Sequence, residues 1–275
     1  MKNKHKKKLK IKWKNILAIF LLIASFITLI ISLYNIINWK LDSNNTNKQI
    51  EKINDIVEVE SSQGEIIPQN EEIEESNPYW DYINMNLINV NFDDLKKENK
   101  DVAGWIQVNG TNINYPYVQT TDNEYYLTHS FDKSKNNAGW VYLDYRNNKD
   151  LSHKNNIIYA HGRYDGTMFG TLKKALTNGW LNDTNNYIIK LSTEKENTLW
   201  QVFSIYRIPT TSDYLQIDFS SNEEFIEFGE KLLYRSQHNF NTNISANDKI
   251  LTLSTCYNDD EKVVLHAKLI KKATR

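Results

Sequence analysis

The chain contains one cysteine, Cys256, which ends a segment whose alternating aliphatic and β-branched residues predict a strand over positions 250–256. A nucleophile in this place has its backbone fixed by the strand, while the loop that follows exposes its sulfur. By itself a lone cysteine is more often a small buried side chain, because only an activated thiolate is a reactive nucleophile. A catalytic role for Cys256 therefore depends on partners elsewhere in the chain.

The first candidate partner is His161, which ends a second apolar segment, residues 157–160, and is followed directly by Gly162. If the two strands are neighbours, the thiol and the imidazole face one pocket. An imidazole can take the proton of a thiol or stabilise its charge, and it can then protonate a leaving amine. The spacing alone leaves a functional and a structural role open for His161.

Acyl transfer also needs donors aimed at the oxyanion that develops on the attacked carbonyl. The backbone N–H of Cys256 or Tyr257 is one candidate donor, and Lys262 at the start of the next predicted strand is another. Arg163 and Arg207 are competing cations. No pair of histidines has metal-ligand spacing beside the cysteine, and no phosphate-binding glycine loop is present, so we expect neither a metal nor a cofactor.

The N-terminal sequence predicts a membrane anchor. Eight lysines and no acidic residue occupy the first fourteen positions, and they directly precede the apolar segment 16–37, which holds no charged residue. As a helix, this segment would span about 33 Å, enough to cross a bilayer. Lysines flanking such a segment stay in the cytoplasm, so we expect membrane attachment rather than nucleic-acid binding, with the rest of the chain outside the cell.

The remainder divides by composition. Residues 1–15 form the predicted cytoplasmic segment, 16–37 the transmembrane anchor, 38–76 a polar, mobile extracellular tether, and 77–275 the folded domain. Within the domain many short predicted strands and few helices favour a closed or nearly closed β-barrel. The strands are expected at residues 104–108, 113–118, 139–145, 156–160, 187–191, 199–208, 250–255 and 263–270, and the helices at 91–97, 167–177 and 222–234.

Taken together, several segments resemble the sortase family, and specifically class B, over residues 81–269. The segment 252–256 (TLSTC) matches the nucleophile motif, and residues 159–161 (YAH) with 165–169 (DGTMF) match the histidine segment. Residues 112–116 (NINYP), 123–127 (NEYYL) and 143–147 (LDYRN) also resemble class B segments. The resemblance implies a mainly β fold: an eight-stranded barrel with N-terminal helices and a helix before the cysteine strand.

The resemblance also implies a transpeptidase that cuts a C-terminal sorting signal of secreted proteins, typically after a threonine. Cys256 would form a thioacyl-enzyme, and His161 would protonate the departing amine. The acceptor would be an amino group of the peptidoglycan cross-bridge or of its lipid-linked precursor. The positions that carry over as substrate contacts are Asn123, Leu127, Tyr159, Thr210, Tyr214, Leu215 and Ser254.

One position departs from the family pattern. Sortases place an arginine just before the final strand, whereas this chain has Lys262 there. Lysine keeps the positive charge but lacks the planar, two-pronged donor. We therefore expect slower acylation than in an arginine-bearing relative. Two other interpretations stay open at this stage, a cysteine peptidase that only hydrolyses its substrate and a wall-associated binding barrel with a structural cysteine.

Overall fold

The computed structural model describes residues 13–69 and 73–275. The chain forms two units, residues 1–42 and residues 43–275. The helices are α1 (Trp13–Ile56), α2 (Tyr79–Tyr82), α3 (Asp93–Glu98), α4 (Asn178–Leu181) and α5 (Asn222–Arg235), with 3-10 helices η1 (Tyr125–Leu127), η2 (Gly170–Leu176) and η3 (Thr184–Asn186). The strands are β1 (Val59–Ser62), β2 (Glu65–Ile66), β3 (Leu87–Val90), β4 (Val102–Val108), β5 (Asn114–Val118), β6 (Tyr142–Leu143), β7 (Asn155–Tyr159), β8 (Ile188–Ser192), β9 (Glu196–Pro209), β10 (Ile250–Cys256) and β11 (Glu261–Thr274).

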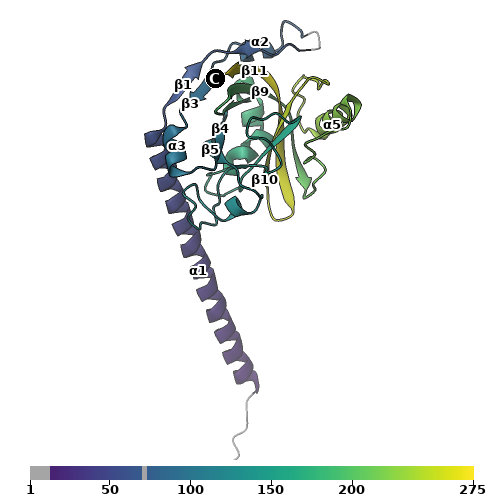
Figure 1. The fold of residues 1–275 in the computed structure, drawn as a ribbon. Helices are drawn as coiled ribbons and strands as arrows, with labels where there is room; N and C mark the ends of the chain where they lie inside the picture. The colour runs from purple at the N-terminus through teal and green to yellow at the C-terminus, as the bar shows by residue number, and fades with distance from the viewer. Residues whose placement is uncertain (1–12, 70–72) are drawn as a thin grey trace, which may run out of the picture. The chain divides into compact units, whose positions relative to one another are not determined.

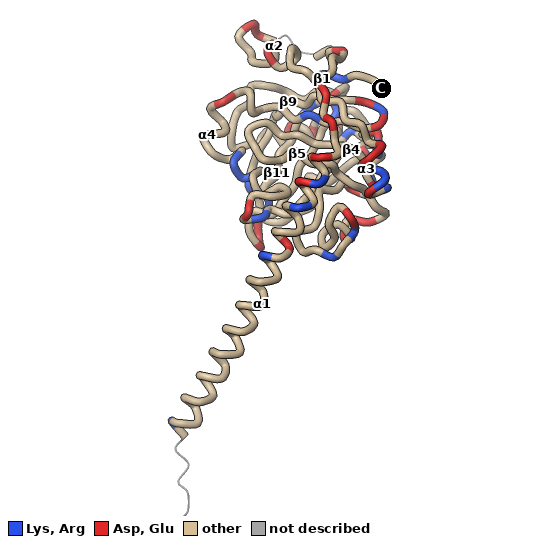
Figure 2. Tube along the Cα trace, turned by 90° about the vertical axis from the view of Figure 1, so that its left-hand side faces the viewer, with Lys and Arg blue, Asp and Glu red and all other residues tan. Residues whose placement is uncertain are grey.

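The described part of the first unit is the N-terminal portion of α1. Its most apolar stretch has a mean hydropathy of 2.9, and by length and composition it is a candidate membrane span. Figure 2 shows this portion of the helix without charged residues between its ends. Residues 1–12, which hold most of the predicted cytoplasmic segment, lie outside the described residues.

The segment expected to be a mobile tether, residues 38–76, is ordered over most of its length, so that expectation was wrong. In the second unit the end of α1 packs on the domain, with Ile53 buried and Ile50 and Ile56 packed against the core. These three isoleucines recur every three residues, which places them on one helix face that the polar composition concealed. Further along, β1 pairs with β3 and β2 pairs with β11. Residues 70–72 of this segment lie outside the described residues.

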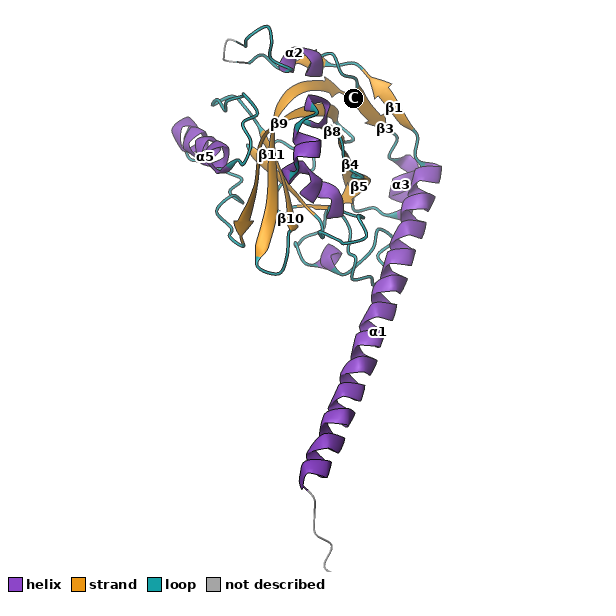
Figure 3. Ribbon diagram, turned by 180° about the vertical axis from the view of Figure 1, so that it is seen from behind, coloured by secondary structure: helices purple, strands orange, loops and turns teal. Residues whose placement is uncertain are grey.

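The second unit is built on a closed eight-stranded β-barrel with the strand order β10-β7-β6-β5-β4-β8-β9-β11, and the pairing of β10 with β11 closes it. The short strand β2 continues the sheet beyond β11. Most neighbours are antiparallel, but β10 pairs parallel with β7, and β5 pairs parallel with β6. Figure 1 shows these strands wrapped around the barrel, and Figure 3 shows α5 outside it, beside β9 and β11.

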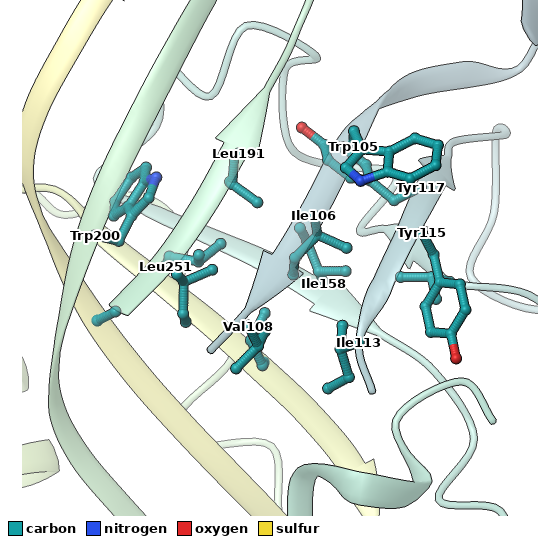
Figure 4. Packing of buried hydrophobic residues seen from close by; sticks show 14 of the residues in the cluster. Trp105, Ile106, Val108, Ile113, Tyr115, Tyr117, Ile158, Leu191, Trp200 and Leu251 are labelled. Carbon is teal, nitrogen blue, oxygen red and sulfur yellow. The ribbon is translucent and has the colours of Figure 1, made fainter. Parts of the chain in front are cut away.

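Two hydrophobic cores hold this unit together. The larger fills the barrel, and Figure 4 shows side chains such as Trp105, Ile106 and Leu251 meeting there. The smaller lies between α5 and the outside of the barrel and includes Phe225 and Ile250. Because successive side chains of a strand point to opposite faces, Leu251 and Ile250 supply one residue to each core. Strand β10 is thus buried on both faces, and its position is fixed from both sides.

The predicted fold class is confirmed: the structure has the eight-stranded barrel and a helix, α5, ahead of β10. Strands β9 and β11 are longer than expected, whereas two other elements are clearly shorter. The strand expected over residues 139–145 is reduced to β6, because Gly139 has a left-handed φ of 61° and the chain turns after Leu143. The helix expected over 167–177 is the 3-10 helix η2, which begins only at Gly170.

Candidate active site

Three neighbouring strands bring the predicted catalytic side chains to one place. Strand β10 lies between β7 and β11, and in the parallel pair Ser254 is opposite Tyr159. Continued by two residues beyond this pair, the register sets His161 opposite Cys256. On the other flank Cys256 is directly opposite Lys262. The strand register therefore supports the predicted convergence of thiol and imidazole.

The ends of β7 and β10 are in close contact beyond their last ladder pair. The hydroxyl of Thr255 donates to the carbonyl of Ala160 at 2.8 Å. A Cβ placed on Gly162 would lie 2.1 Å from the carbonyl oxygen of Cys256. Glycine at position 162 is thus required for the two catalytic segments to approach this closely.

The His161 ring is held by the backbone of η1. Its Nε2 lies 2.8 Å from the carbonyl oxygen of Leu127. A carbonyl can only accept, so Nε2 carries the hydrogen and Nδ1 is the nitrogen left for proton exchange. Gly139 packs against the same ring, since a Cβ there would lie 3.0 Å from its Cδ2 atom.

The side chain of Lys262 lies at the thiol, with its Nζ donating to Cys256 Sγ at 2.9 Å. The two competing cations are engaged elsewhere. Arg163 donates to Asp165 at 2.7 Å, and Arg207 donates to Glu261 at 2.7 Å. Of the three candidate cations, Lys262 is the one the fold brings to the cysteine.

One expected oxyanion donor is already used. The backbone N–H of Tyr257 donates to the carbonyl of Glu261 at 2.8 Å, inside the short turn that joins β10 to β11. Of the two candidate backbone donors, Cys256 and Tyr257, the N–H of Tyr257 is thus engaged in this turn. The ammonium of Lys262 remains beside the sulfur.

Several predicted substrate contacts line the neighbouring surface on the β6–β7 side. Tyr159 is half-buried, and its ring is tilted by 31° against that of Tyr142 with the ring centroids 5.3 Å apart. Its hydroxyl donates to Asp144 at 2.9 Å. Burial and the nearby charge of Asp144 raise the pKa of Tyr159 above its ordinary value. Leu127, half-buried, supplies the carbonyl that holds His161, and Asn123 accepts from the backbone N–H of Tyr145 at 3.0 Å.

The remaining predicted contacts belong to the loop after β9 and to β10. The hydroxyls of Tyr214 and Ser254 lie 2.9 Å apart, and both residues are buried. Leu215 is half-buried against the smaller core. Thr210 is exposed and donates its backbone N–H to Asp260 at 2.9 Å, so the structure places it at the β10–β11 turn rather than beside Ser254.

Three residues of the site, Tyr142, Asp144 and Arg146, have no role assigned by the sequence reasoning. Tyr142 is buried, and burial together with the charges of Asp144 and Cys256 raises its pKa well above its ordinary value. Asp144 is buried and bonds both Tyr159 and Arg146. The signal was present, because these residues lie in or next to the class B segment 143–147, but only the contacts reveal what they touch.

Comparison with known proteins places the chain in a family. The family model for the sortase domain matches residues 106–270. Sortase B of Listeria monocytogenes is 35% identical over 185 residues, which cover 65% of this chain and 74% of that protein. The Staphylococcus aureus sortase B–substrate complex has a TM-score of 0.61 and 33% identity, and covers 66% of this chain and 84% of that one. A structure of sortase B complexed with triglycine has a TM-score of 0.62 and 33% identity, with coverage of 66% and 85%.

The similarity to these structures covers about two thirds of the chain at a TM-score above 0.6. The matched residues include Cys256, His161 and Lys262. The chain belongs to the sortase family, class B, and is a cysteine transpeptidase.

Proposed function

We propose that this protein is a membrane-anchored transpeptidase that attaches secreted proteins to the cell wall through a thioacyl-enzyme on Cys256. The observation that carries the proposal is the meeting of three strands at the sulfur. Lys262 Nζ lies 2.9 Å from Cys256 Sγ on one flank, and His161 leaves the parallel partner strand on the other. A thiol flanked by a cation and an imidazole is the arrangement that nucleophilic catalysis by cysteine requires.

In the first half-reaction the thiolate of Cys256 attacks the carbonyl of the residue before the scissile bond. A bond forms between sulfur and carbonyl carbon, and the C–N bond breaks. His161, with Nε2 held by Leu127, delivers a proton from Nδ1 to the leaving amine. The ammonium of Lys262 stabilises the thiolate before attack and the oxyanion during it.

In the second half-reaction an incoming amine attacks the thioacyl carbon. His161 accepts the amine's proton, the new C–N bond forms, and the thiolate of Cys256 leaves. The same nitrogen thus works in both directions, which explains why the ring is fixed by a backbone carbonyl rather than by a mobile side chain.

The substrates follow from the family. The sorting signal of a secreted protein would lie over the half-buried Asn123, Leu127, Tyr159 and Leu215, with Thr210 at its margin. Tyr214 and Ser254 are buried and would support this surface from within. One relative was solved with its substrate and another with triglycine, a short peptide that carries an amine. We assign the acceptor here to an amino group of the peptidoglycan cross-bridge or its lipid-linked precursor.

The cellular placement rests on α1. Its candidate membrane span and the lysines before it support a single-pass anchor over residues 16–37, with residues 1–15 in the cytoplasm and the catalytic domain, 77–275, outside the cell. An outward-facing enzyme meets both secreted proteins and cell-wall amines.

The test uses the full chain in detergent micelles, a library of peptides with threonine before the scissile bond, and triglycine as acceptor. We expect joined peptide–triglycine product that rises with triglycine concentration and is absent with Cys256→Ala. Hydrolysis alone at saturating triglycine would favour the peptidase interpretation. Product formation by Cys256→Ala would refute the catalytic cysteine.

A further inference from the structure

The turn that follows β6 contacts three separate parts of the surface proposed to bind the sorting signal. Its residues are Asp144, Tyr145 and Arg146, and each of them contacts a different segment of the chain. None of the three touches the thiol, and none was predicted to be a site residue. Their contacts nevertheless define the geometry of that surface.

Asp144 holds the side chain of Tyr159, at the end of β7. Its side chain is fully buried, and its Oδ2 accepts from the hydroxyl of Tyr159 at 2.9 Å. Burial alone would raise the pKa of Asp144, but hydrogen bonds from Arg146 and Tyr159 outweigh it and hold the pKa below its ordinary value. The group is therefore a charged carboxylate at neutral pH, and Tyr159 has a strong acceptor for its hydroxyl.

Tyr145 and Arg146 contact the other two segments, which contain Asn123 and Leu215. The backbone N–H of Tyr145 donates to the side-chain oxygen of Asn123 at 3.0 Å. The Nη2 of Arg146 donates to the backbone carbonyl of Leu215 at 3.0 Å. Asn123 precedes η1 and Leu215 belongs to the loop after β9, so one three-residue turn joins segments that are distant in the sequence.

The ion pair at the base of this turn has a rigid geometry. Arg146 grips Asp144 with two parallel bonds, from Nε to Oδ1 at 2.9 Å and from Nη2 to Oδ2 at 2.8 Å. The backbone N–H of Arg146 also donates to Oδ1 at 2.9 Å. A two-pronged pair fixes orientation as well as distance, which a lysine in place of the arginine could not do.

The loop that contains Leu215 is held by a second side chain besides Arg146. Buried Asn155 donates to the carbonyls of Tyr214 and Gln216 at 3.3 and 2.8 Å. Together with Arg146 on Leu215, three consecutive carbonyls of this loop are held by side chains of the barrel. The loop is thus positioned by its backbone, and the half-buried Leu215 side chain packs against the smaller core and is partly exposed.

We propose that Asp144 and Arg146 are positioning residues. They set the spacing between the segments that contain Tyr159, Asn123 and Leu215, and thereby the affinity of this site for the sorting signal. The inference rests on the proposed function, since it assumes that Tyr159, Asn123 and Leu215 contact the signal. The pair acts on binding and leaves the chemistry to Cys256, His161 and Lys262.

The test compares Arg146→Lys with Arg275→Lys in the full chain. Arg275 is a matched control, because it donates instead to the carbonyls of Val90 and Thr193. The probe is a fluorogenic peptide with threonine before the scissile bond, selected for cleavage by the unaltered protein. We expect Arg146→Lys to raise KM about 5- to 10-fold, as for the loss of about one oriented hydrogen bond, with kcat within about two-fold. Alkylation of Cys256 by iodoacetamide should keep its rate.

Asp144→Asn provides a second variant that leaves Arg146 without its carboxylate, and we expect a larger rise in KM.

An unchanged KM in Arg146→Lys, or an equal rise in Arg275→Lys, would overturn the inference. A fall in kcat at constant KM would do the same, since it would place the pair in the chemistry. If the unaltered protein forms a thioacyl-enzyme and these outcomes appear, the inference alone fails. If it forms none with any peptide, the proposed function fails and the inference with it.

Discussion

The two flanks of β10 hold the cysteine's partners in different ways. On the β7 flank, backbone atoms fix His161: Leu127 binds its Nε2, and the segment at Gly162 lies against the carbonyl of Cys256. On the β11 flank, Lys262 reaches the sulfur with a long side chain from a strand that enters through a short turn. The histidine flank is constrained by the fold, and the lysine flank by one side chain.

This difference separates two tasks. Proton transfer requires a ring at a fixed distance and angle, and small displacements of a reacting group are costly. A positive charge acts over a longer range and tolerates a flexible carrier. We therefore expect the histidine flank to be intolerant of a single added methyl group and the lysine flank to accept substitution with graded effects.

The largest effect should come from Gly162→Ala, which leaves all catalytic side chains in place. The new Cβ would lie 2.1 Å from the carbonyl oxygen of Cys256, so the ends of β7 and β10 must separate. We expect kcat/KM to fall about 100-fold, the usual cost of displacing a reacting group by about an ångström. Steady-state cleavage of the selected peptide measures it.

Gly179→Ala is the matched control, because the nearest atom to its new Cβ is 4.0 Å away. Its activity should equal that of the unaltered protein. Equal activity of both variants would show that the β7 flank is not rigid, and the comparison of the two flanks would break down.

An intermediate effect should follow from changes at Lys262. Lys262→Met removes the charge at the sulfur and should lower the acylation rate about 10- to 100-fold, as for the loss of one oxyanion donor or less. Lys262→Arg restores the planar donor and should raise turnover a few-fold. Single-turnover acylation kinetics measure both. Unchanged kinetics in both variants would point to another cation, such as Arg163.

The smallest effect concerns pH and the lower part of the lysine flank, where Thr252 bonds His266 at 2.9 Å across β10 and β11. Burial, and then the charges of Arg235 and Lys231, lower the pKa of His266 to about 3. In the unfolded chain the imidazole of His266 binds a proton near pH 6.5. The contribution of neutral His266 to the free energy of unfolding is therefore complete above that pH and is lost as the pH falls toward 3.

Between pH 7 and pH 5 we expect this residue to remove about 2 kcal/mol from the free energy of unfolding. In His266→Gln, whose side chain does not titrate, the free energy of unfolding should fall less over the same pH range. Urea denaturation at both pH values measures it. Identical slopes in the two proteins would mean that acid acts on other groups.

The sequence was sufficient to predict the barrel and to propose Cys256, His161 and Lys262 as candidates, because both steps depend on local patterns. Alternation of apolar residues marks β10, and the Asn109–Gly110 pair marks the β4–β5 hairpin, where Gly110 has the left-handed φ of 70°. The candidate Lys262 was found by its place at the start of the next strand, although two arginines competed with it.

What the sequence could not supply depends on contacts between distant segments. The packing of residues 43–56 was missed because three isoleucines are hidden among polar residues. The roles of Asp144 and Arg146 were missed because their partners, Tyr159 and Leu215, come from other strands and loops. The loss of the Tyr257 N–H as a donor depends on a turn geometry that residue types do not determine.

The most direct test of the account is to trap the covalent intermediate and locate it. The full chain is mixed with the selected peptide without acceptor, quenched in acid, digested, and analysed by mass spectrometry. We predict that the acyl fragment of the peptide is attached to Cys256, that triglycine discharges it, and that His161→Ala slows both its formation and its discharge. An adduct on any other residue, or peptide cleavage that persists in Cys256→Ala, would contradict the account.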